Sequence, residues 1–282
     1  MKGLQWSPLD HVELFAGKMA VTLAQLEDNK RCAALDLEYG GRCMDFMTPG
    51  GFVNAVFQVL RLSPGSSLTL APVCSTWVWV SRGSTKRSRA LPLGNTGAPS
   101  VRLGNLMVGR CALLLLLAAA RGVWWVLEQP KGSLLEYHPA MQRVLRRIRV
   151  WRKYVRMADY AAASDKGTWL YSSRPEIEDL DQFKPRRVVK RKAVALVDHY
   201  VDSKGKHRVK GNSQLKVSQA YTQEFGRAMA QLRSKHSSTV KKSSRAFLRK
   251  AAAGSKEKRI QQELSFWAKH ADLDPVFTFL TS

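Results

Sequence analysis

The feature that most constrains the fold is an alternation of strand-like and helix-like segments along the first 175 or so residues. Short apolar segments predict strands, and segments with apolar residues at helical spacing predict the helices between them. The predicted strands are 11–15, 32–37, 67–73, 123–127, 153–157 and 168–171, and the predicted helices are 19–26, 51–62, 101–121 and 134–148. This alternation indicates a Rossmann-like, doubly wound α/β fold, a mostly parallel sheet with helices on both faces.

The charge of the chain is concentrated in its last hundred residues. The net charge is +24, and residues 184–259 hold 22 Lys and Arg against 4 Asp and Glu. Such an excess favours a polyanionic partner, which we expect to be nucleic acid, with DNA preferred to RNA. We therefore expect an α/β core over 1–183 and a basic C-terminal extension. In that extension, 184–233 holds a short hairpin or insert and a helix that returns to the core, and 234–282 is a basic, flexible tail with a terminal helix over 263–279.

Other features of the sequence narrow the class of protein further. The longest apolar run, Ala112 to Ala120, is too short to cross a bilayer, which takes roughly 18 or more residues, so we expect no membrane association. The four cysteines lack the spacing of a zinc site, so we expect free thiols in a reducing compartment and no metal. The basic clusters favour an intracellular, nuclear protein. Nothing in the sequence indicates an oligomeric state.

Residues with useful chemistry stand at the carboxyl ends of the predicted strands, where open parallel sheets bind their ligands. They are Glu13, Phe15, Ala16 and Gly17 after the first strand, Asp36 at the end of the second, Pro72 and Cys74 after the third, and Glu128 after the fourth. A thiol and a carboxyl group at one edge of a sheet are suited to nucleophilic and acid catalysis.

Four motifs in this order resemble those of the cytosine-5 DNA methyltransferases. The motifs are Glu13-Leu14-Phe15-Ala16-Gly17, Ala71-Pro72-Val73-Cys74-Ser75, Val126-Leu127-Glu128-Gln129-Pro130, and Gln219-Ala220-Tyr221 with Phe225 and Ala228. They are similar to that family's Phe-x-Gly-x-Gly turn, Pro-Pro-Cys-Gln loop, Glu-Asn-Val strand end and late Asn-Ala-Val-Pro helix. The resemblance covers roughly residues 11–172 and 215–233.

The resemblance implies an S-adenosylmethionine-dependent methyltransferase that acts at carbon 5 of cytosine. Carbon 5 is a poor nucleophile, and a thiolate that adds to carbon 6 turns the ring into an enamine that can attack a methyl sulfonium. Cys74 would be this nucleophile, and Glu128 would grip the cytosine edge. The residues implied for S-adenosylmethionine are Glu13, Phe15, Ala16, Gly17, Asp36, Asp45 and Pro72, and those implied for the substrate are Ser75, Arg82, Lys86, Arg87 and Lys166.

Each of these residues also has a purely structural interpretation. Cys74 could be a small buried hydrophobe, and Glu128 a surface salt-bridge acid. Asp36 could cap a helix, and Asp45 could begin a turn. The loop after Cys74 contains Trp77 and Trp79 among its cations. The cations could contact phosphates while the tryptophans stack on a base. Alternatively, the loop is solvated and the tryptophans belong to the core.

Departures from the family leave other functions open. Lys18-Met19-Ala20 stands where the family has further glycines, and Ser75 and Gln129 replace other residues. The segment between Tyr171 and Leu215, about 43 residues, is short for a target-recognition domain. The alternatives are a tRNA or RNA cytosine methyltransferase and a catalytically inactive nucleic-acid-binding module. A nicotinamide dehydrogenase is disfavoured because no Gly-x-Gly-x-x-Gly follows the first strand.

Overall fold

The protein is built around one six-stranded sheet, in a computed structural model that describes residues 7–186, 194–242 and 256–281. The strands stand in the order β2-β1-β3-β4-β6-β5. Their bounds are β1 Leu9–Leu14, β2 Cys32–Leu35, β3 Leu62–Leu70, β4 Trp124–Pro130, β5 Trp151–Arg156 and β6 Gly167–Ser172. The first four strands are mutually parallel, and β6 runs antiparallel between β4 and β5. The chain thus has the Rossmann-like, mostly parallel fold that the sequence predicts.

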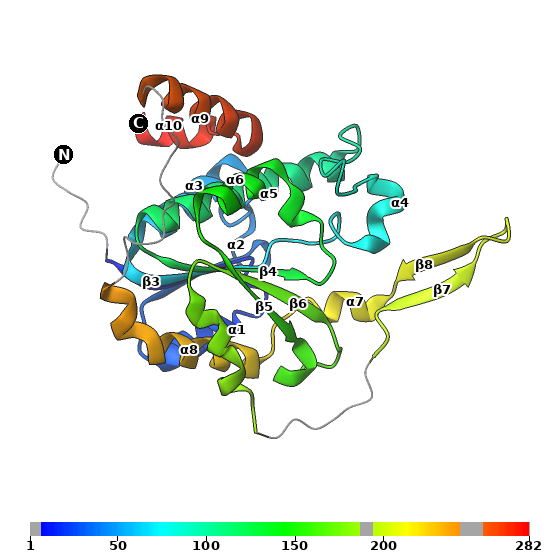
Figure 1. The fold of residues 1–282 in the computed structure, drawn as a ribbon, viewed down its shortest axis with the longest axis horizontal. Coiled ribbons are helices and arrows are strands. Elements are labelled where there is room, and N and C mark those ends of the chain that lie inside the picture. The colour runs from blue at the N-terminus through cyan, green and yellow to red at the C-terminus, as the bar shows by residue number, and fades with distance from the viewer. Residues whose placement is uncertain (1–6, 187–193, 243–255, 282) are drawn as a thin grey trace.

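One face of the sheet carries α3 (Pro49–Arg61), α5 (Pro99–Ala120) and α6 (Pro139–Arg147), above the strands in Figure 1. Each of these helices begins at a proline, whose fixed φ suits the first helical turn. Thr48 caps α3, because its hydroxyl oxygen accepts a bond from the Gly51 N–H. The side chains between these helices and the sheet form one continuous apolar cluster that includes Leu70, Leu115 and Leu127.

The other face is covered by α1 (Ala20–Glu27) and by α8 (Gln223–Lys242), which returns from late in the chain (Figure 1). Phe225 and Met229 of α8 pack with Val126 of β4 in a second, smaller apolar cluster. The two helices touch closely, since a Cβ on Gly226 would lie 2.1 Å from the Ala20 carbonyl oxygen. Only a glycine at this position lets α8 lie directly on the start of α1.

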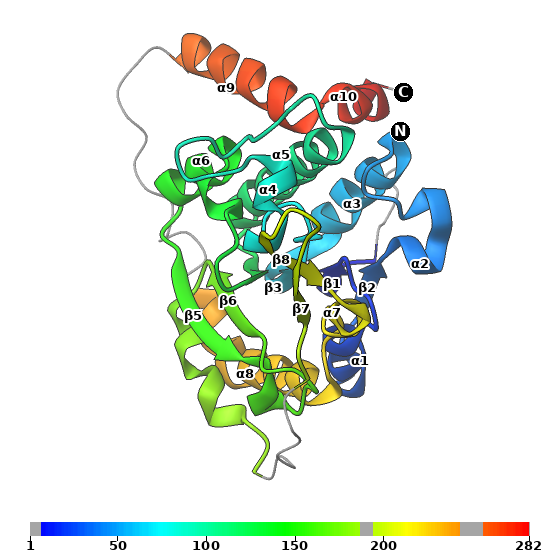
Figure 2. The ribbon, with the colours of Figure 1, turned by 90° about the vertical axis from the view of Figure 1, so that its right-hand side faces the viewer.

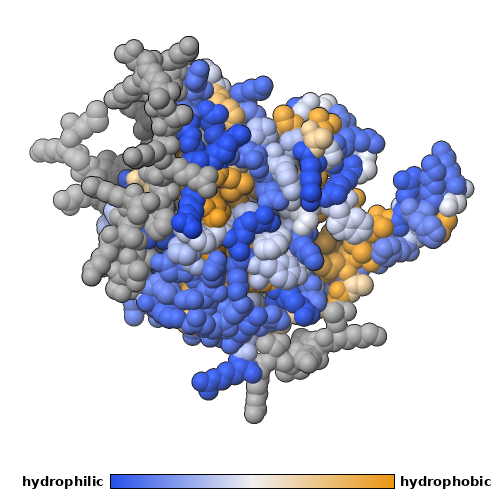
Figure 3. Space-filling model, viewed as in Figure 1, coloured by the Kyte–Doolittle hydropathy of each residue, from blue (hydrophilic) through white to orange (hydrophobic). Residues whose placement is uncertain are grey.

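Shorter elements connect and extend this core. They are α2 (Leu37–Gly40), η1 (Gly41–Cys43), η2 (Trp79–Ser81), α4 (Arg82–Thr85), η3 (Leu135–Tyr137), η4 (Met157–Tyr160), η5 (Pro175–Phe183) and α7 (Ser213–Val217). Strands β7 (Val197–Val201) and β8 (His207–Gly211) form an antiparallel hairpin. It projects from the body on the side where α4 lies, as Figures 1 and 2 show. Hydrophilic side chains cover most of it, and hydrophobic ones gather where it joins the core (Figure 3).

The described part of the tail forms two helices, α9 (Lys256–Ala271) and α10 (Asp274–Thr281), that dock outside α5 and α3 (Figure 1). Arg110 of α5 is buried beneath them and donates to the Ala271 carbonyl, the Asp272 carboxylate and the Phe46 carbonyl. Glu263 of α9 accepts from Arg143 and Arg147 of α6. The terminal helix predicted over 263–279 is therefore broken near Asp272. The basic segment 184–259 and the tail predicted over 234–282 lie partly outside the described residues.

Three other predictions about elements differ from the structure. β4 continues past Glu128 to Pro130, because β6 supplies a partner as far as Thr168. The helix predicted over 134–148 is divided, since Pro139 follows His138 and only α6 beyond it is α-helical. The apolar run was expected to be too short to cross a membrane, but α5 as a whole is long and apolar enough by length and composition alone. In the structure, 56% of its most apolar window is buried inside the protein.

Candidate active site

The candidate site lies at the topological switch point of the sheet. From β1 the chain moves to β2 on one side and then returns to β3 on the other side of β1. In open α/β sheets this reversal leaves a crevice at the carboxyl ends of the two central strands, which is where ligands bind. The segment Phe15–Met19 follows β1, and Ala71–Cys74 follows β3, so both predicted loops border this crevice.

Cys74 lies beside a buried ion pair. The Lys166 ammonium is 3.2 Å from a Glu128 carboxylate oxygen, and the two side chains are only 13% and 6% exposed. Burial raises the pKa of the Cys74 thiol, the charge of Lys166 lowers it, and that of Glu128 raises it. Burial lowers the pKa of Lys166, but the charges of Glu128 and Cys74 outweigh it, so this pKa is raised. The fold thus brings a thiol, a carboxylate and an ammonium group together from β4 and from the segments after β3 and before β6.

Glu128 lies inside β4 rather than after its end, opposite Leu170 of β6. It is buried, so it is not the surface acid of the alternative interpretation. The next residue, Gln129, points to the opposite face of the sheet. Its amide nitrogen donates to the Pro72 carbonyl over 2.9 Å, and its carbonyl accepts from Ser133. Gln129 therefore fixes the Cys74 loop to β4, a role that the sequence did not reveal although it marked this residue as a departure from the family.

The loop after β1 has an unusual backbone. Phe15, Gly17 and Met19 all have positive φ values, of 59°, 50° and 54°. The Gly17 N–H donates to the Asp36 carboxylate over 2.9 Å, and its carbonyl accepts from the Tyr39 hydroxyl. A Cβ on Gly17 would meet no atom within 4 Å, so the loop presents bare backbone to open space there. Such a turn lets a ligand approach the main chain closely.

Two of the three acids predicted to bind a cofactor, Asp36 and Asp45, accept hydrogen bonds from nearby backbone N–H groups. Asp36 caps α2, because its second carboxylate oxygen accepts from the Glu38 N–H. Asp45 begins a turn, because its carboxylate accepts from the Met47 N–H over 2.9 Å. The structural interpretations of both residues are thus present in the fold. A carboxylate oxygen that accepts one bond keeps a lone pair for another, so these contacts leave room for a ligand.

The remaining residues predicted at the cofactor site are less exposed. Glu13 points beneath α1, where one carboxylate oxygen accepts from the Thr22 N–H and hydroxyl over 2.7 and 2.6 Å. Burial raises the pKa of Glu13 to about 7, although the bonds from Thr22 lower it. Ala16 and Pro72 are buried. Phe15 is partly buried and packs edge-to-face on Phe46 at 4.9 Å.

The loop after Cys74 divides into buried and exposed residues. Ser75, Arg82 and Lys86, which the resemblance implies for the substrate, are exposed. Trp77 is fully buried, whereas Trp79 is 50% exposed, so one tryptophan belongs to the core and the other remains on the surface.

The prediction that Arg87 contacts substrate is wrong. This side chain is 2% exposed and lies 3.5 Å from the Trp77 ring centre. Its guanidinium donates to the Pro92 carbonyl, the Asn105 amide oxygen and the Val101 carbonyl. The Arg87 guanidinium is thus bonded to acceptors from the end of the loop and from α5. The side chain stabilises the loop instead of facing a phosphate.

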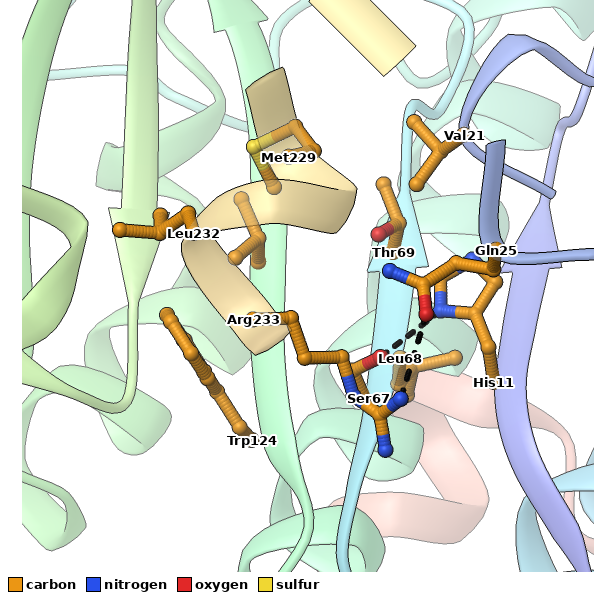
Figure 4. A pocket seen from close by; sticks show the side chains of 11 residues that line it. His11, Val21, Gln25, Ser67, Leu68, Thr69, Trp124, Met229, Leu232 and Arg233 are labelled. Atoms are coloured by element: carbon orange, nitrogen blue, oxygen red, sulfur yellow. Dashed lines mark hydrogen bonds between the residues drawn. The ribbon is translucent and has the colours of Figure 1, made fainter. Parts of the chain in front are cut away.

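A small cavity lies on the α8 face of the sheet, and Cys74 is not among the residues that line it (Figure 4). His11 Nδ1 is 2.8 Å from the Ser67 hydroxyl, and Arg233 donates to the Gln25 amide oxygen over 3.2 Å (Figure 4). Burial and then the charge of Arg233 lower the pKa of His11 to about 3, so this histidine is neutral. The cavity therefore combines a few polar side chains with apolar ones from β3, β4 and α8.

Comparisons with known proteins find a likeness only among solved structures. No protein-family model and no curated protein sequence matches the chain. The chain is similar to the crystal structure of the S. pombe Dnmt2 methyltransferase, at 13% sequence identity and a TM-score of 0.34. The match covers 63% of this chain and 55% of that one, about half of its length.

Proposed function

We propose that this chain is an S-adenosylmethionine-dependent methyltransferase that acts at carbon 5 of cytosine in DNA, with Cys74 as nucleophile. The observation that carries the proposal is the meeting of Cys74 with Glu128 and Lys166 at the switch point of the sheet. Burying an ion pair has a high desolvation cost, so a pair beside a thiol at a ligand-binding edge favours a role in chemistry. The motifs around Cys74 and Glu128 resemble those of cytosine-5 methyltransferases, which supports this reaction over others.

The three side chains have distinct roles in this reaction. The Cys74 thiol gives its proton to the Glu128 carboxylate, and the sulfur forms a bond to carbon 6 of the cytosine. The electron pair of the ring double bond moves toward carbon 5, and Glu128 stabilises the charge by hydrogen bonding or proton donation at the ring nitrogen. Lys166 stabilises the Cys74 thiolate, since its charge lowers the pKa of that thiol. The negative charge of Glu128 raises the pKa of the Cys74 thiol, and a substrate that binds Glu128 would weaken this effect.

The residues at the ends of β1 and β2 fit the cofactor. S-adenosylmethionine would supply an electrophilic methyl group. The bare backbone at Gly17 would lie against it, and the carboxylate of Asp36 would accept from its ribose hydroxyls. Asp45 and Phe15 would bind its adenine end. Glu13 and Ala16 are buried, so they would support the loop after β1 without touching the cofactor directly. Pro72, which is also buried, would position the loop that carries Cys74.

A nucleic-acid partner follows from the charge and from the exposed residues around Cys74. Trp79 can stack on a base, and Arg82 and Lys86 can contact phosphates. The β7–β8 hairpin adds Lys204, Arg208 and other cations on the same side of the molecule. A base must leave its duplex to reach the half-buried thiol of Cys74, so we expect base flipping on DNA. We expect a nuclear location for such a protein.

Two alternatives remain. The protein could methylate cytosine in tRNA or another RNA, which fits the short segment between the core and α8. It could instead be a catalytically inactive module that binds nucleic acid. The buried Glu128–Lys166 pair speaks against the second, because drift in an inactive protein would be expected to remove a desolvated pair that no longer serves chemistry.

Trapping with a mechanism-based substrate tests the proposal. The protein is incubated with S-adenosylmethionine and a DNA or RNA oligonucleotide that contains 5-fluorocytosine, whose fluorine blocks release of the enzyme. We expect a stable covalent adduct with wild type and none with Cys74→Ser. Cys43→Ser, at an exposed thiol, is the matched control and should form the adduct normally. Adduct on RNA alone would favour the first alternative, and no adduct on either polymer would favour the inactive module.

A further inference from the structure

One buried hydroxyl near the site has no partner. Tyr221 stands just before α8, and its hydroxyl oxygen is inaccessible and makes no hydrogen bond to any residue that the structure describes. Leaving a buried hydroxyl unpaired destabilises the fold, and the large majority of buried polar groups have a hydrogen-bond partner. Such a group in a folded protein therefore needs an explanation.

The surroundings of this hydroxyl are the groups of the candidate site. Burial and the charges of Glu128, Glu13 and Cys74 raise the pKa of Tyr221 well above its usual value, so it stays a neutral O–H donor. Glu13 and Glu128 point to the face of the sheet that α8 covers, and Gly226 brings the start of α8 onto Ala20. The hydroxyl is therefore buried on the same face of the sheet as Glu13 and Glu128, and close enough to both carboxyl groups and to Cys74 for their charges to affect it.

The ring of Tyr221 is held in place by its neighbours. Its centre lies 4.8 Å from that of Phe225, which is itself buried. The next residue, Thr222, donates from its hydroxyl to the Tyr160 carbonyl over 2.5 Å, which anchors the start of α8. These contacts keep the hydroxyl from turning toward solvent, so its hydrogen-bond acceptor has to be a group that enters the site.

We propose that Tyr221 donates a hydrogen bond to an acceptor atom of the pyrimidine held between Cys74 and Glu128, most simply its ring carbonyl oxygen. This assignment rests on the proposed function and adds a substrate contact to it. Cytosine presents a carbonyl oxygen and a ring nitrogen as neighbouring acceptors, so a carboxyl group and a neutral hydroxyl can read that edge together. A hydroxyl built for such a contact leaves an unpaired donor when the site is empty.

The competing explanation is a partner within the protein. One oxygen of Glu13 is also buried without a partner, and a small rotation could join it to the Tyr221 hydroxyl. The two explanations differ in what the hydroxyl does for the ligand-free protein. A bond to Glu13 would stabilise the fold, whereas a donor that waits for substrate destabilises it slightly.

Tyr221→Phe separates these explanations, with Tyr160→Phe as the matched control. Both tyrosines pack on Phe225, but the Tyr160 hydroxyl donates to the Leu180 carbonyl. We expect Tyr221→Phe to unfold at the same or a higher temperature than wild type without ligand. We expect its rate of adduct formation with the 5-fluorocytosine oligonucleotide to fall roughly tenfold or more, as loss of one good hydrogen bond implies. Tyr160→Phe should keep the wild-type rate.

Each other result overturns the assignment. A lower unfolding temperature with an unchanged rate would show that the Tyr221 hydroxyl serves the fold, and would leave the proposed function standing. An unchanged rate and an unchanged temperature would show that the hydroxyl meets neither substrate nor protein. Absence of adduct with wild type itself would overturn the proposed function and this assignment with it.

Discussion

The two faces of the sheet differ in what their central strands bury. Toward α3, α5 and α6 the strands β1 and β3 place Val12, Leu14, Leu68 and Leu70. Toward α1 and α8 the same strands place His11, Glu13, Ser67 and Thr69. Both faces are covered by helices, so His11, Glu13 and Thr69 are buried as well and Ser67 is partly buried. The first face therefore stabilises the fold by burial, whereas the second carries polar groups that reduce that gain.

Both faces also bury polar atoms that make no hydrogen bond to the described residues. On the α8 face they include His11 Nε2, one oxygen of Glu13 and the Tyr221 hydroxyl, and on the other face the indole nitrogens of Trp77 and Trp125. Natural proteins tolerate such groups where function requires them. What distinguishes the α8 face is that it buries the carboxyl groups of Glu13 and Glu128 near the carboxyl edge of the sheet.

The largest expected effect belongs to the apolar face. Leu70→Ala removes a side chain that is 0% exposed and leaves a cavity, so we expect the free energy of unfolding to fall by about 3 kcal/mol. Thr69→Val, one residue earlier and on the opposite face, keeps the side-chain volume. It should change the free energy of unfolding by less than about 1 kcal/mol. Urea denaturation measures both. Equal losses would mean that the two faces contribute alike and would break the comparison.

The next effect is a gain on the polar face. Burial raises the pKa of Glu13 from 4.5 to about 7, so the folded protein holds a proton there that the unfolded chain releases. Wild type therefore loses stability from this group as the pH rises from about 4.5 to 7. Glu13→Gln cannot ionise, so we expect it to be more stable than wild type by about 2–3 kcal/mol at pH 8 and equal to it near pH 4.

Chemical denaturation across this pH range checks the prediction for Glu13. Glu27→Gln, at an exposed position of the same helix that covers Glu13, is the control and should change the stability little at either pH. A difference between Glu13→Gln and wild type that does not depend on pH would show that Glu13 is charged throughout, and that the polar face tolerates an ionised carboxylate.

The sequence predicts the sheet and the edge of it that carries the site, because both depend on local patterns. Apolar segments separated by helices specify the parallel order, and that order alone sends Cys74 and Glu128 to one edge. The alternation in Ser67-Leu68-Thr69-Leu70 is typical of a strand with one face in water. Here that face is covered by α8, more than 150 residues later, so local pattern could not reveal its burial.

The errors at individual residues have the same origin. Arg87 lies in a polar, cationic loop, yet acceptors from Pro92, Val101 and Asn105 draw it into the interior. Glu128 was expected beyond its strand, but pairing with β6 extends β4 past it. Both outcomes depend on contacts between segments distant in sequence, which residue types and spacing do not specify.

The smallest predicted effect concerns the reactivity of the Cys74 thiol, on which two opposite charges act. Glu128 raises the pKa of the thiol and Lys166 lowers it, so removing each charge should shift reactivity in opposite directions. Glu128→Gln should make Cys74 react several-fold faster with iodoacetamide near pH 7, because the thiolate fraction rises. Lys166→Met should make it several-fold slower. Cys43, which is exposed, serves as an internal reference and should react at the same rate in all three proteins.

Peptide mapping after timed alkylation measures these rates without any substrate. Burial also raises the pKa of Cys74, and a substitution that loosened the loop would speed alkylation through exposure alone. Glu128→Gln and Lys166→Met break the same ion pair, so loosening would act in the same direction in both. Opposite shifts therefore report charge, whereas two faster reactions would show that packing controls the thiol, and the catalytic role of the ion pair would lose its basis.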